Sequence, residues 1–309
     1  MKKFLILVLA LTIFLSLITG CTSNSTTDNI NSILNDTKED SSSLNSDSQL
    51  PDIEETPAED FKYEYDVSTQ GIKILGYEGS SKEVRIPEKI ENKPVTSIGQ
   101  EVFKKRSTEY IYIPNTVIEI GSEAFYGCKQ LEEVVLFNGL ENIGTGAFLD
   151  CESLTSLVIP GSITEIGSMA FAECENLSYV SIENGVKIIG SSAFMSCPNI
   201  SEIVLPDSVT EIKYCAFQNC SGLSKITIPN NVTAIGYRVF NNCTSLTEIS
   251  IPDGVTIIDS GTFSGCTSLV NISIPNEMKK ISNSAFSDCT ALSEESLKRI
   301  QEINPDIEI

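Results

Sequence analysis

The sequence contains no histidine and no tryptophan among its 309 residues. Without histidine, the chain cannot build a Ser-His-Asp triad, a Cys-His pair or a histidine metal site. It also has no P-loop and no Gly-x-Gly-x-x-Gly run after a strand. Carboxylate pairs remain as possible catalysts, but the acidic positions follow no fixed pattern. We therefore expect a protein that is not an enzyme and that holds no cofactor and no metal.

Basic residues are scarce, with 21 Lys and Arg against 42 Asp and Glu and a formal net charge of −21. Such a balance repels phosphate backbones, which argues against nucleic acid as a partner. Calcium could bind acidic side chains, but the chain has no EF-hand loop and no Gly-Gly-x-Gly-x-Asp repeat.

Long hydrophobic runs are also missing, except for one at the start. Lys2 and Lys3 precede an apolar run that ends at Ile18, which is typical of a secretory signal. The following Ile-Thr-Gly-Cys resembles the lipobox of bacterial lipoproteins. This resemblance implies a signal peptide at 1–20, a diacylglycerol on Cys21 and an exported protein anchored to the bacterial membrane at the cell surface. The alternative is an ordinary signal with a chance cysteine.

Residues 21–60 are rich in Ser, Thr, Asn and Asp and contain few large apolar side chains. Such a segment buries too little surface to offset the entropy of ordering. We expect a disordered acidic tether that holds the remainder of the chain at a distance from the membrane.

The main feature of the sequence is an internal repeat of 23 residues. A phenylalanine precedes each repeated cysteine by three positions, from Phe125 to Phe286. The cysteines, termed the thiol ladder below, are Cys128, Cys151, Cys174, Cys197, Cys220, Cys243, Cys266 and Cys289. One such unit cannot bury its own apolar side, so neighbouring units must stack.

The repeating unit reads AFxxCxxLxxIxIPxxVxxIGxx. Within it, Leu-x-x-Ile-x-Ile predicts a short strand with alternate residues turned inward, and the following Pro ends that strand. The Val-x-x-Ile-Gly segment predicts a second extended pass and a turn. These features predict a repeat solenoid of 23-residue leucine-rich repeats with short parallel strands over 104–292.

The motif IGxxAFxxCxxL resembles the BspA-like, or Treponema-type, leucine-rich repeats of bacterial surface proteins. The segment GIKILGYEGSSKEVRIPEKIENKPVTSIGQEVF is similar to the N-terminal entry of that family, so the resemblance covers residues 61–309. It implies a surface-displayed protein that binds a protein or glycan ligand and acts as an adhesin for host or microbial macromolecules. The alternative is a cell-envelope scaffold lipoprotein without a host ligand.

Both ends of the repeat array are atypical, as expected of caps. Residues 61–103 predict a β-rich N-terminal cap in which the repeat spacing is irregular. Residues 293–309 predict a capping helix and tail, with Ser293 as N-cap.

Each ladder cysteine occupies the same interior point of its coil, beside a buried phenylalanine. Buried cysteine behaves as a small apolar side chain, and parallel side chains in register give poor disulfide torsions. Free thiols are therefore favoured over disulfides, and zinc is disfavoured because the chain has no Cys-x-x-Cys pair. Cys215 is off the ladder in a mixed row that we interpret as exposed, so it is an incidental surface residue or a thiol for intermolecular bridging.

Outward positions of the predicted strands differ along the array: the first half is aromatic and β-branched, and the second half is polar. Tyr110, Tyr112, Phe137 and Tyr179 are predicted to gather near the N-terminal end as a ligand-binding surface. The alternative is that these rings satisfy strand propensity or pack under the N-terminal hairpin. The sequence leaves the oligomeric state open.

Overall fold

The computed structural model describes residues 54–307 and 309, which belong to one compact unit, Glu54–Ile309. The predicted signal peptide, Cys21 and most of the predicted tether lie outside the described residues. Among the described residues, no helix has the length and apolar character that a membrane span requires.

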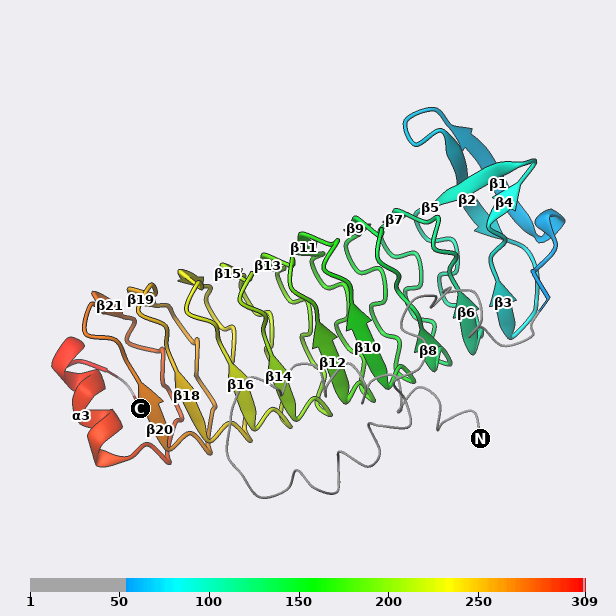
Figure 1. Ribbon diagram of the computed structural model, residues 1–309. Helices are drawn as coiled ribbons and strands as arrows, with labels where there is room; N and C mark the ends of the chain where they lie inside the picture. The colour runs from blue at the N-terminus through cyan, green and yellow to red at the C-terminus, as the bar shows by residue number, and fades with distance from the viewer. Residues whose placement is uncertain (1–53, 308) are drawn as a thin grey trace, which may run out of the picture. The chain divides into compact units, whose positions relative to one another are not determined.

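Stacked coils form the unit, and each coil contributes two short strands on different sides (Figure 1). The first row of strands is β3 (Glu83–Arg85), β6 (Tyr110–Tyr112), β8 (Glu133–Val134), β10 (Ser156–Ile159), β12 (Tyr179–Ile182), β14 (Glu202–Val204), β16 (Lys225–Thr227), β18 (Glu248–Ser250) and β20 (Asn271–Ser273). The second row is β5 (Lys93–Ile98), β7 (Glu119–Ile120), β9 (Asn142–Ile143), β11 (Glu165–Ile166), β13 (Ile188–Ile189), β15 (Glu211–Ile212), β17 (Ala234–Ile235), β19 (Ile257–Ile258) and β21 (Lys280–Ile281).

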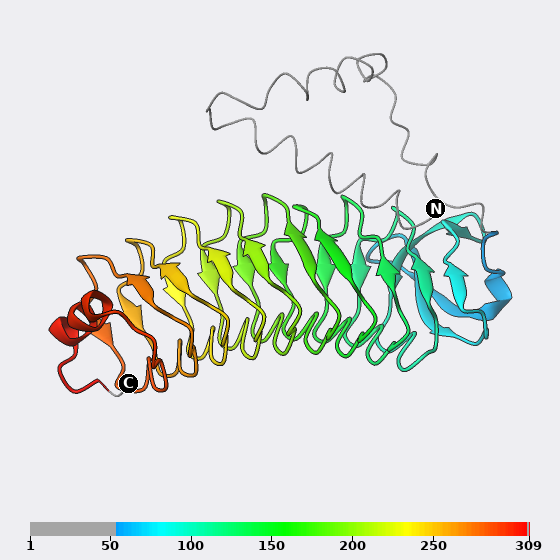
Figure 2. The same cartoon turned by 90° about the horizontal axis from the view of Figure 1, so that it is seen from below.

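Within each row, most neighbouring strands pair in parallel, so equivalent residues of successive coils lie side by side. Leu157 pairs with Val180, and Ile249 pairs with Ile272. Because side chains alternate along a strand, buried and outward residues alternate in the first-row strands, as Leu157 and Ile159 are buried in β10 and Ile249 is buried in β18. The predicted solenoid with 23-residue repeats is confirmed, and the strand rows are visible in Figure 2.

The repeated phenylalanines form one continuous stack through the core, called the phenylalanine stack below. Consecutive rings from Phe103 to Phe286 lie nearly parallel, with centroid distances between 4.8 and 5.9 Å. At the N-terminal end Tyr77 and Phe61 extend the stack with tilted rings. The coil spacing therefore brings one fully buried ring of each repeat against the next.

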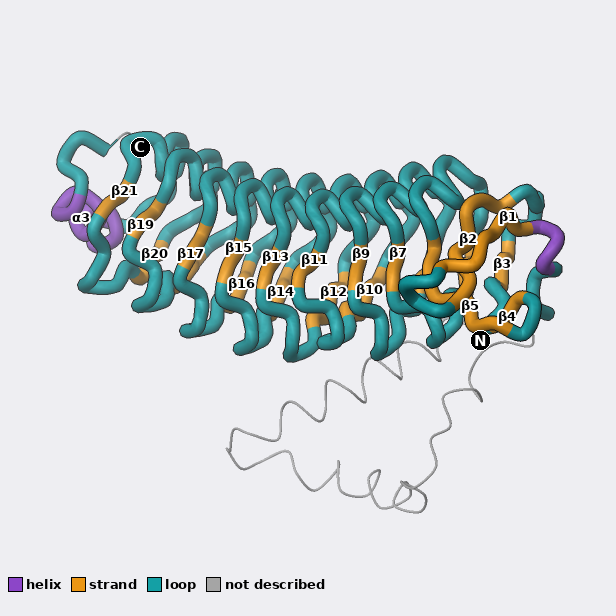
Figure 3. Tube along the Cα trace, turned by 90° about the horizontal axis from the view of Figure 1, so that it is seen from above, coloured by secondary structure: helices purple, strands orange, loops and turns teal. Residues whose placement is uncertain are grey.

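The turns that carry these rings are held by backbone hydrogen bonds between coils, although they are not strands (Figure 3). The Phe148 amide donates to the Ala170 carbonyl at 2.8 Å, and the Phe194 amide donates to the Ala216 carbonyl at 2.9 Å. One residue of positive φ lies two positions before the phenylalanine of these turns, and another lies two positions after it. The first group is Glu101, Glu123, Gly146, Met169, Ser192, Cys215, Arg238 and Gly261. The second group is Lys105, Gly127, Asp150, Glu173, Ser196, Asn219, Asn242, Gly265 and Asp288.

The N-terminal end is closed by short elements that are not repeats. The 3₁₀ turn η3 (Ala58–Asp60) leads into the antiparallel hairpin of β1 (Phe61–Asp66) and β2 (Gly71–Tyr77), and β4 (Lys89–Ile90) pairs with β5. Strand β2 then pairs in parallel with β5, and β3 pairs with β6 in the register of the repeats. The first coil therefore begins within residues 83–99.

Helix α3 (Glu294–Ile303) covers the last coil at the C-terminal end. The Ser293 hydroxyl accepts from the Ser296 amide, as an N-cap does. Three side chains then satisfy the open backbone: Ser296 bridges the Val270 carbonyl and the Ile272 amide, Arg299 donates to the Pro275 carbonyl, and Asn304 donates to the Ile281 carbonyl. The predicted capping helix is confirmed, and its polar side chains complete the hydrogen bonds of the final strands.

Candidate functional site

The thiol ladder lies in the core beside the phenylalanine stack. All eight ladder cysteines are fully buried and carry free thiols. Each thiol donates to the carbonyl of the phenylalanine one coil earlier, as Cys197 does to Phe171 at 3.1 Å and Cys243 does to Phe217 at 3.2 Å. The ladder therefore connects neighbouring coils through weak side-chain donors.

Burial also removes the chemical reactivity of these thiols. It raises the pKa of Cys128 to about 11 and the pKa of Cys220 to about 12. At neutral pH the ladder consequently holds thiols and not thiolates, and the thiolate is the form that attacks disulfides or binds metals. Within residues 54–307, no group of three or more acidic or cysteine side chains is arranged to hold a metal ion.

Cys215 corrects our interpretation of its row as exposed. Its side chain is only 9% exposed, and burial raises the pKa of its thiol. The residue has a φ of +56°, in common with most members of its row. The mixture of residue types in this row therefore does not report exposure; the common feature is the left-handed backbone. Limited access makes Cys215 a poor candidate for the intermolecular bridging considered above.

The outward side chains of the first-row strands form a surface that we call the strand face. On β6, β8, β10 and β12 these side chains are half-buried. On β14, β16, β18 and β20 they are exposed. The strand face therefore has a half-buried N-terminal half, which carries the tyrosines, and a solvated C-terminal half, and only the first resembles the core of an interface.

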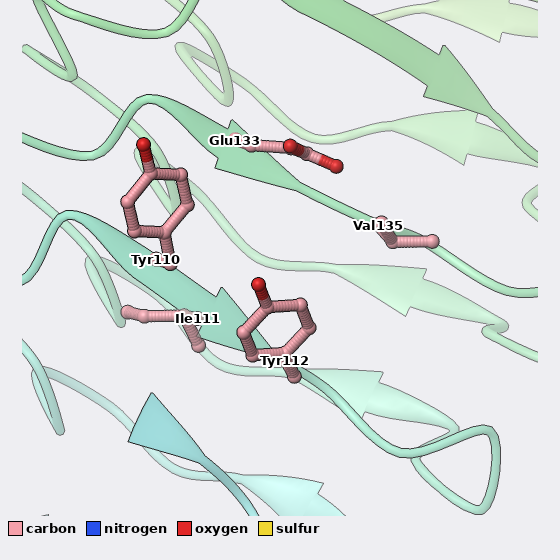
Figure 4. A pocket seen from close by; sticks show the side chains of 5 residues that line it. All are labelled: Tyr110, Ile111, Tyr112, Glu133 and Val135. Atoms are coloured by element: carbon pink, nitrogen blue, oxygen red, sulfur yellow. The ribbon is translucent and has the colours of Figure 1, made fainter. Parts of the chain in front are cut away.

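A shallow hollow lies in the apolar half, lined by Tyr110, Ile111, Tyr112, Glu133 and Val135. Figure 4 shows the two tyrosine rings projecting from β6 toward the neighbouring strand β8, which carries Glu133 and is followed by Val135. Tyr110 lies opposite Glu133 in the strand register. We call this hollow the tyrosine pocket.

Carboxylates surround the tyrosine pocket. The Tyr110 hydroxyl donates to Glu132 at 2.9 Å, and that hydrogen bond raises the pKa of Tyr110 to about 12. Burial, followed by the charge of Glu132, raises the pKa of Glu133. Burial, followed by the charges of Glu133 and Glu83, also raises the pKa of Tyr112. The pocket is therefore aromatic and electronegative.

The structure brings together two of the four residues that were predicted to gather. Tyr110 and Tyr112 share the pocket, but Phe137 and Tyr179 do not line it. Phe137 is half-buried in the segment after β8. Tyr179 pairs with Ser156 on β10, so β8 and β10 separate it from β6. Tyr110, Tyr112 and Tyr179 therefore lie on the strand face and Phe137 lies beside it, and the four side chains do not form one cluster.

Sequence reasoning missed a second aromatic feature, on the turn that follows the second-row strands. Tyr214 and Tyr237 stack with ring centroids 5.3 Å apart and an interplanar angle of 5°, and their side chains are 46% and 47% exposed. The signal was present as two tyrosines spaced by one repeat. Elsewhere the row holds small polar residues: Ser122, Thr145, Ser168, Ser191, Ser260 and Asn283.

Comparisons with known proteins agree with this architecture. A sequence profile described as BspA type leucine rich repeat region matches residues 96–224 and 211–307, with six copies of the repeat. No curated protein sequence matches the chain.

Solved structures of bacterial leucine-rich repeat proteins also resemble the chain. The T. pallidum leucine-rich repeat protein is 24% identical and aligns with a TM-score of 0.53 over 83% of this chain and 100% of that chain. A leucine rich cell surface protein from Faecalibacterium prausnitzii is 23% identical, with a TM-score of 0.35 over 81% and 98% of the two chains. A leucine-rich repeat protein from Bacteroides ovatus is 22% identical, with a TM-score of 0.38 over 84% and 99%. At this level of identity, the first comparison supports the fold alone.

Proposed function

The chain belongs to the family of BspA-type leucine-rich repeat proteins, and from this premise we propose that its strand face binds a macromolecule at the cell surface. Membership of this family supports a role as a protein-interaction module. Leucine-rich repeat solenoids spread contact over many coils instead of concentrating it in one deep site.

One observation carries the proposal: the outward side chains of the strand face change from half-buried, up to β12, to exposed, from β14 onward. Interfaces need a desolvated apolar centre with aromatic anchors and a polar rim. The coils from β6 to β12 supply the centre, with Tyr110, Tyr112, Phe137 and Tyr179 as anchors. The polar coils from β14 onward supply the rim.

We further propose that the protein is exported and displayed as a lipoprotein, with an acidic tether between the anchor and the solenoid. The support is the sequence of the first residues, where a basic start and an apolar run lead to Cys21. Two acyl chains on that cysteine would suffice for stable attachment. On this basis the ligand belongs outside the cell, and an adhesin for host or microbial protein or glycan is the specific function that we propose.

A binding experiment with residues 54–309 tests the ligand proposal. This compact unit contains the whole described core, from Phe61 to Ile300. Immobilised wild-type unit and a variant with Tyr110, Tyr112, Phe137 and Tyr179 changed to alanine are exposed to purified host matrix proteins and, separately, to the cell's own envelope extract. We expect capture of a matrix protein by the wild type and its loss in the variant.

Two outcomes would contradict the proposal. Capture of envelope partners alone would favour a cell-envelope scaffold over an adhesin. Unchanged capture by a correctly folded quadruple variant would remove the strand face from the function. The Tyr214→Ala and Tyr237→Ala variant is the matched control, because it deletes exposed rings away from the strand face.

The anchor proposal has its own test. Cells that express the full chain or its Cys21→Ser variant are labelled with a radioactive fatty acid. Label on the wild type and its absence from the variant are the expected results. Equal labelling of both proteins, or of neither, would overturn the lipid attachment at Cys21.

A further inference from the structure

The tyrosine pocket combines a pair of tyrosine rings with a carboxylate, Glu133, that forms no ion pair in the described part of the chain. The rings of Tyr110 and Tyr112 project from one strand to the same side. The Glu133 carboxylate lies on the adjacent strand, in register with Tyr110. Among the ion pairs of the described residues, none includes Glu133.

The charges around this pocket are predominantly negative. Glu132 is bound by the Tyr110 hydroxyl and has no ion pair in the described part of the chain, whereas Glu109 pairs with Lys82 at 2.5 Å. Glu83 lies opposite Tyr110 on β3, and Arg85 lies opposite Tyr112 on that same strand. Both belong to the side of β6 that faces away from Glu133, because β6 pairs with β3 on one edge and with β8 on the other.

A half-buried carboxylate without a cation is costly, and the raised pKa of Glu133 expresses that cost. A cation that enters the pocket would lower the cost. It would also meet the tyrosine rings, which attract cations through their π faces. The chain as a whole, with its net charge of −21, favours the approach of a positively charged partner.

We propose that the tyrosine pocket is the recognition site for an arginine side chain in a basic segment of the protein ligand, with the guanidinium against Tyr110 and Tyr112 and paired with Glu133. This proposal rests on the proposed binding function of the strand face and specifies the chemistry of the partner.

Arginine fits these residues better than lysine does. Its guanidinium is planar, so it can stack on an aromatic ring and still direct two donors at one carboxylate. The lysine ammonium is a compact, strongly hydrated charge that loses more hydration on entering a shallow pocket. Val135, at the edge of the pocket, offers an apolar contact for the arginine methylenes.

The test uses a fluorescent glycine peptide that carries spaced arginines, and two peptides of the same length with lysine or with uncharged citrulline in their place. Binding to residues 54–309 is measured by anisotropy at low and at physiological salt. The arginine peptide is expected to bind more tightly than the lysine peptide, and the citrulline peptide is expected not to bind.

Variants then locate the binding. Glu133→Gln and Tyr112→Ser should each lower the affinity for the arginine peptide by about fivefold, which corresponds to one favourable cation–π or ion-pair contact. The matched control for charge is Glu248→Gln, because Glu248 lies in the same outward row on β18 without an aromatic neighbour on its own strand. The matched control for aromatic area is Tyr214→Ser with Tyr237→Ser. Both controls should change the affinity by less than twofold.

Equal losses in Glu133→Gln and Glu248→Gln would overturn the proposal, because they would indicate diffuse attraction to an acidic protein. Equal binding of the arginine and lysine peptides would overturn the preference for a guanidinium. If the quadruple alanine variant loses the macromolecular ligand but wild type ignores the arginine peptide, the pocket assignment fails and the binding function remains. If the quadruple alanine variant still binds the macromolecular ligand, the proposed binding function of the strand face is wrong, and the pocket proposal that rests on it is wrong as well.

Discussion

The phenylalanine stack and the pair of Tyr214 and Tyr237 have almost the same ring geometry in opposite surroundings. Phe194 and Phe217 lie 5.6 Å apart with an interplanar angle of 2°, and the two tyrosines lie 5.3 Å apart at 5°. The phenylalanine rings are inaccessible to solvent, whereas nearly half of each tyrosine side chain is exposed. The spacing of the coils therefore sets the ring distance at both places, and only burial differs.

Rings with the same stacking geometry should therefore contribute differently to stability, depending on how far they are buried. An aromatic pair in contact contributes about 0.5–1.5 kcal/mol beyond the area that it buries, but full burial of a large ring contributes several times more. The interior rows should therefore determine whether the solenoid folds, and the exterior rows should determine what it binds. Substitutions along one coil can test this division.

The largest effect is expected in the phenylalanine stack. Phe194→Ala removes a fully buried ring from between Phe171 and Phe217 and should lower the free energy of unfolding by about 3–5 kcal/mol. Urea unfolding of residues 54–309, followed by circular dichroism, measures the loss. Phe194→Leu is the control, because it keeps most of the apolar volume and should cost less. A loss below about 1 kcal/mol for Phe194→Ala would contradict the assigned role of the stack.

A smaller loss is expected where the helix covers the last coil. Ser296→Ala removes the hydroxyl that accepts from the Ile272 amide at 3.1 Å and donates to the Val270 carbonyl at 3.2 Å. The Ile272 amide then loses its partner, whereas the Val270 carbonyl still accepts from the Ser293 amide at 2.9 Å, so the loss should be about 1–2 kcal/mol. Hydrogen exchange measured by mass spectrometry should be faster in the variant than in the wild type within β20 and α3, and unchanged in the central coils.

Ser296→Thr is the conservative control, since it retains the hydroxyl. If exchange accelerates equally along the whole array in Ser296→Ala, then α3 does not act as a local cap.

The thiol ladder should contribute less for each residue. Cys243→Ala deletes the donor to the Phe217 carbonyl, but that carbonyl also accepts from the Cys220 amide at 3.2 Å and is therefore not left without a partner. The expected loss is about 1 kcal/mol in urea unfolding. In the native wild type, burial keeps the thiol pKa values above the neutral range, so thiol reagents should react slowly and should react fully after unfolding.

Cys243→Ser keeps a hydroxyl donor at the same position and isolates the hydrogen bond from the packing. Cysteines that fail to react even in the unfolded protein, and that react after reduction, would identify disulfides in place of free thiols.

The sequence predicted the interior of the molecule well because interior positions repeat for a physical reason. Phe171 and Cys174 recur every 23 residues because the equivalent positions of all coils are fully buried in the same core. Exposed positions have no such constraint, and there the predictions were less accurate. Cys215 was interpreted as exposed because its row is mixed, but a left-handed backbone and packing between coils govern that row. Tyr179 was predicted to gather with Tyr110 because both are outward in the same row near the N-terminal end, but β8 and β10 lie between their strands.

The smallest effect on stability is expected at the exposed tyrosine pair, and it completes the comparison. Replacing Tyr214 and Tyr237 by serine, the residue present in the same row at Ser168 and Ser260, should change the free energy of unfolding by less than about 0.5 kcal/mol, as is usual for surface substitutions. Urea unfolding of this variant and of Phe194→Ala under the same conditions compares the contributions of the two ring stacks to the free energy of unfolding. A loss near that of Phe194→Ala would mean that ring stacking stabilises coils without burial. A negligible loss would show that the solenoid tolerates change at this turn, so that exposed rows are available for variation in binding while the buried rows keep the fold.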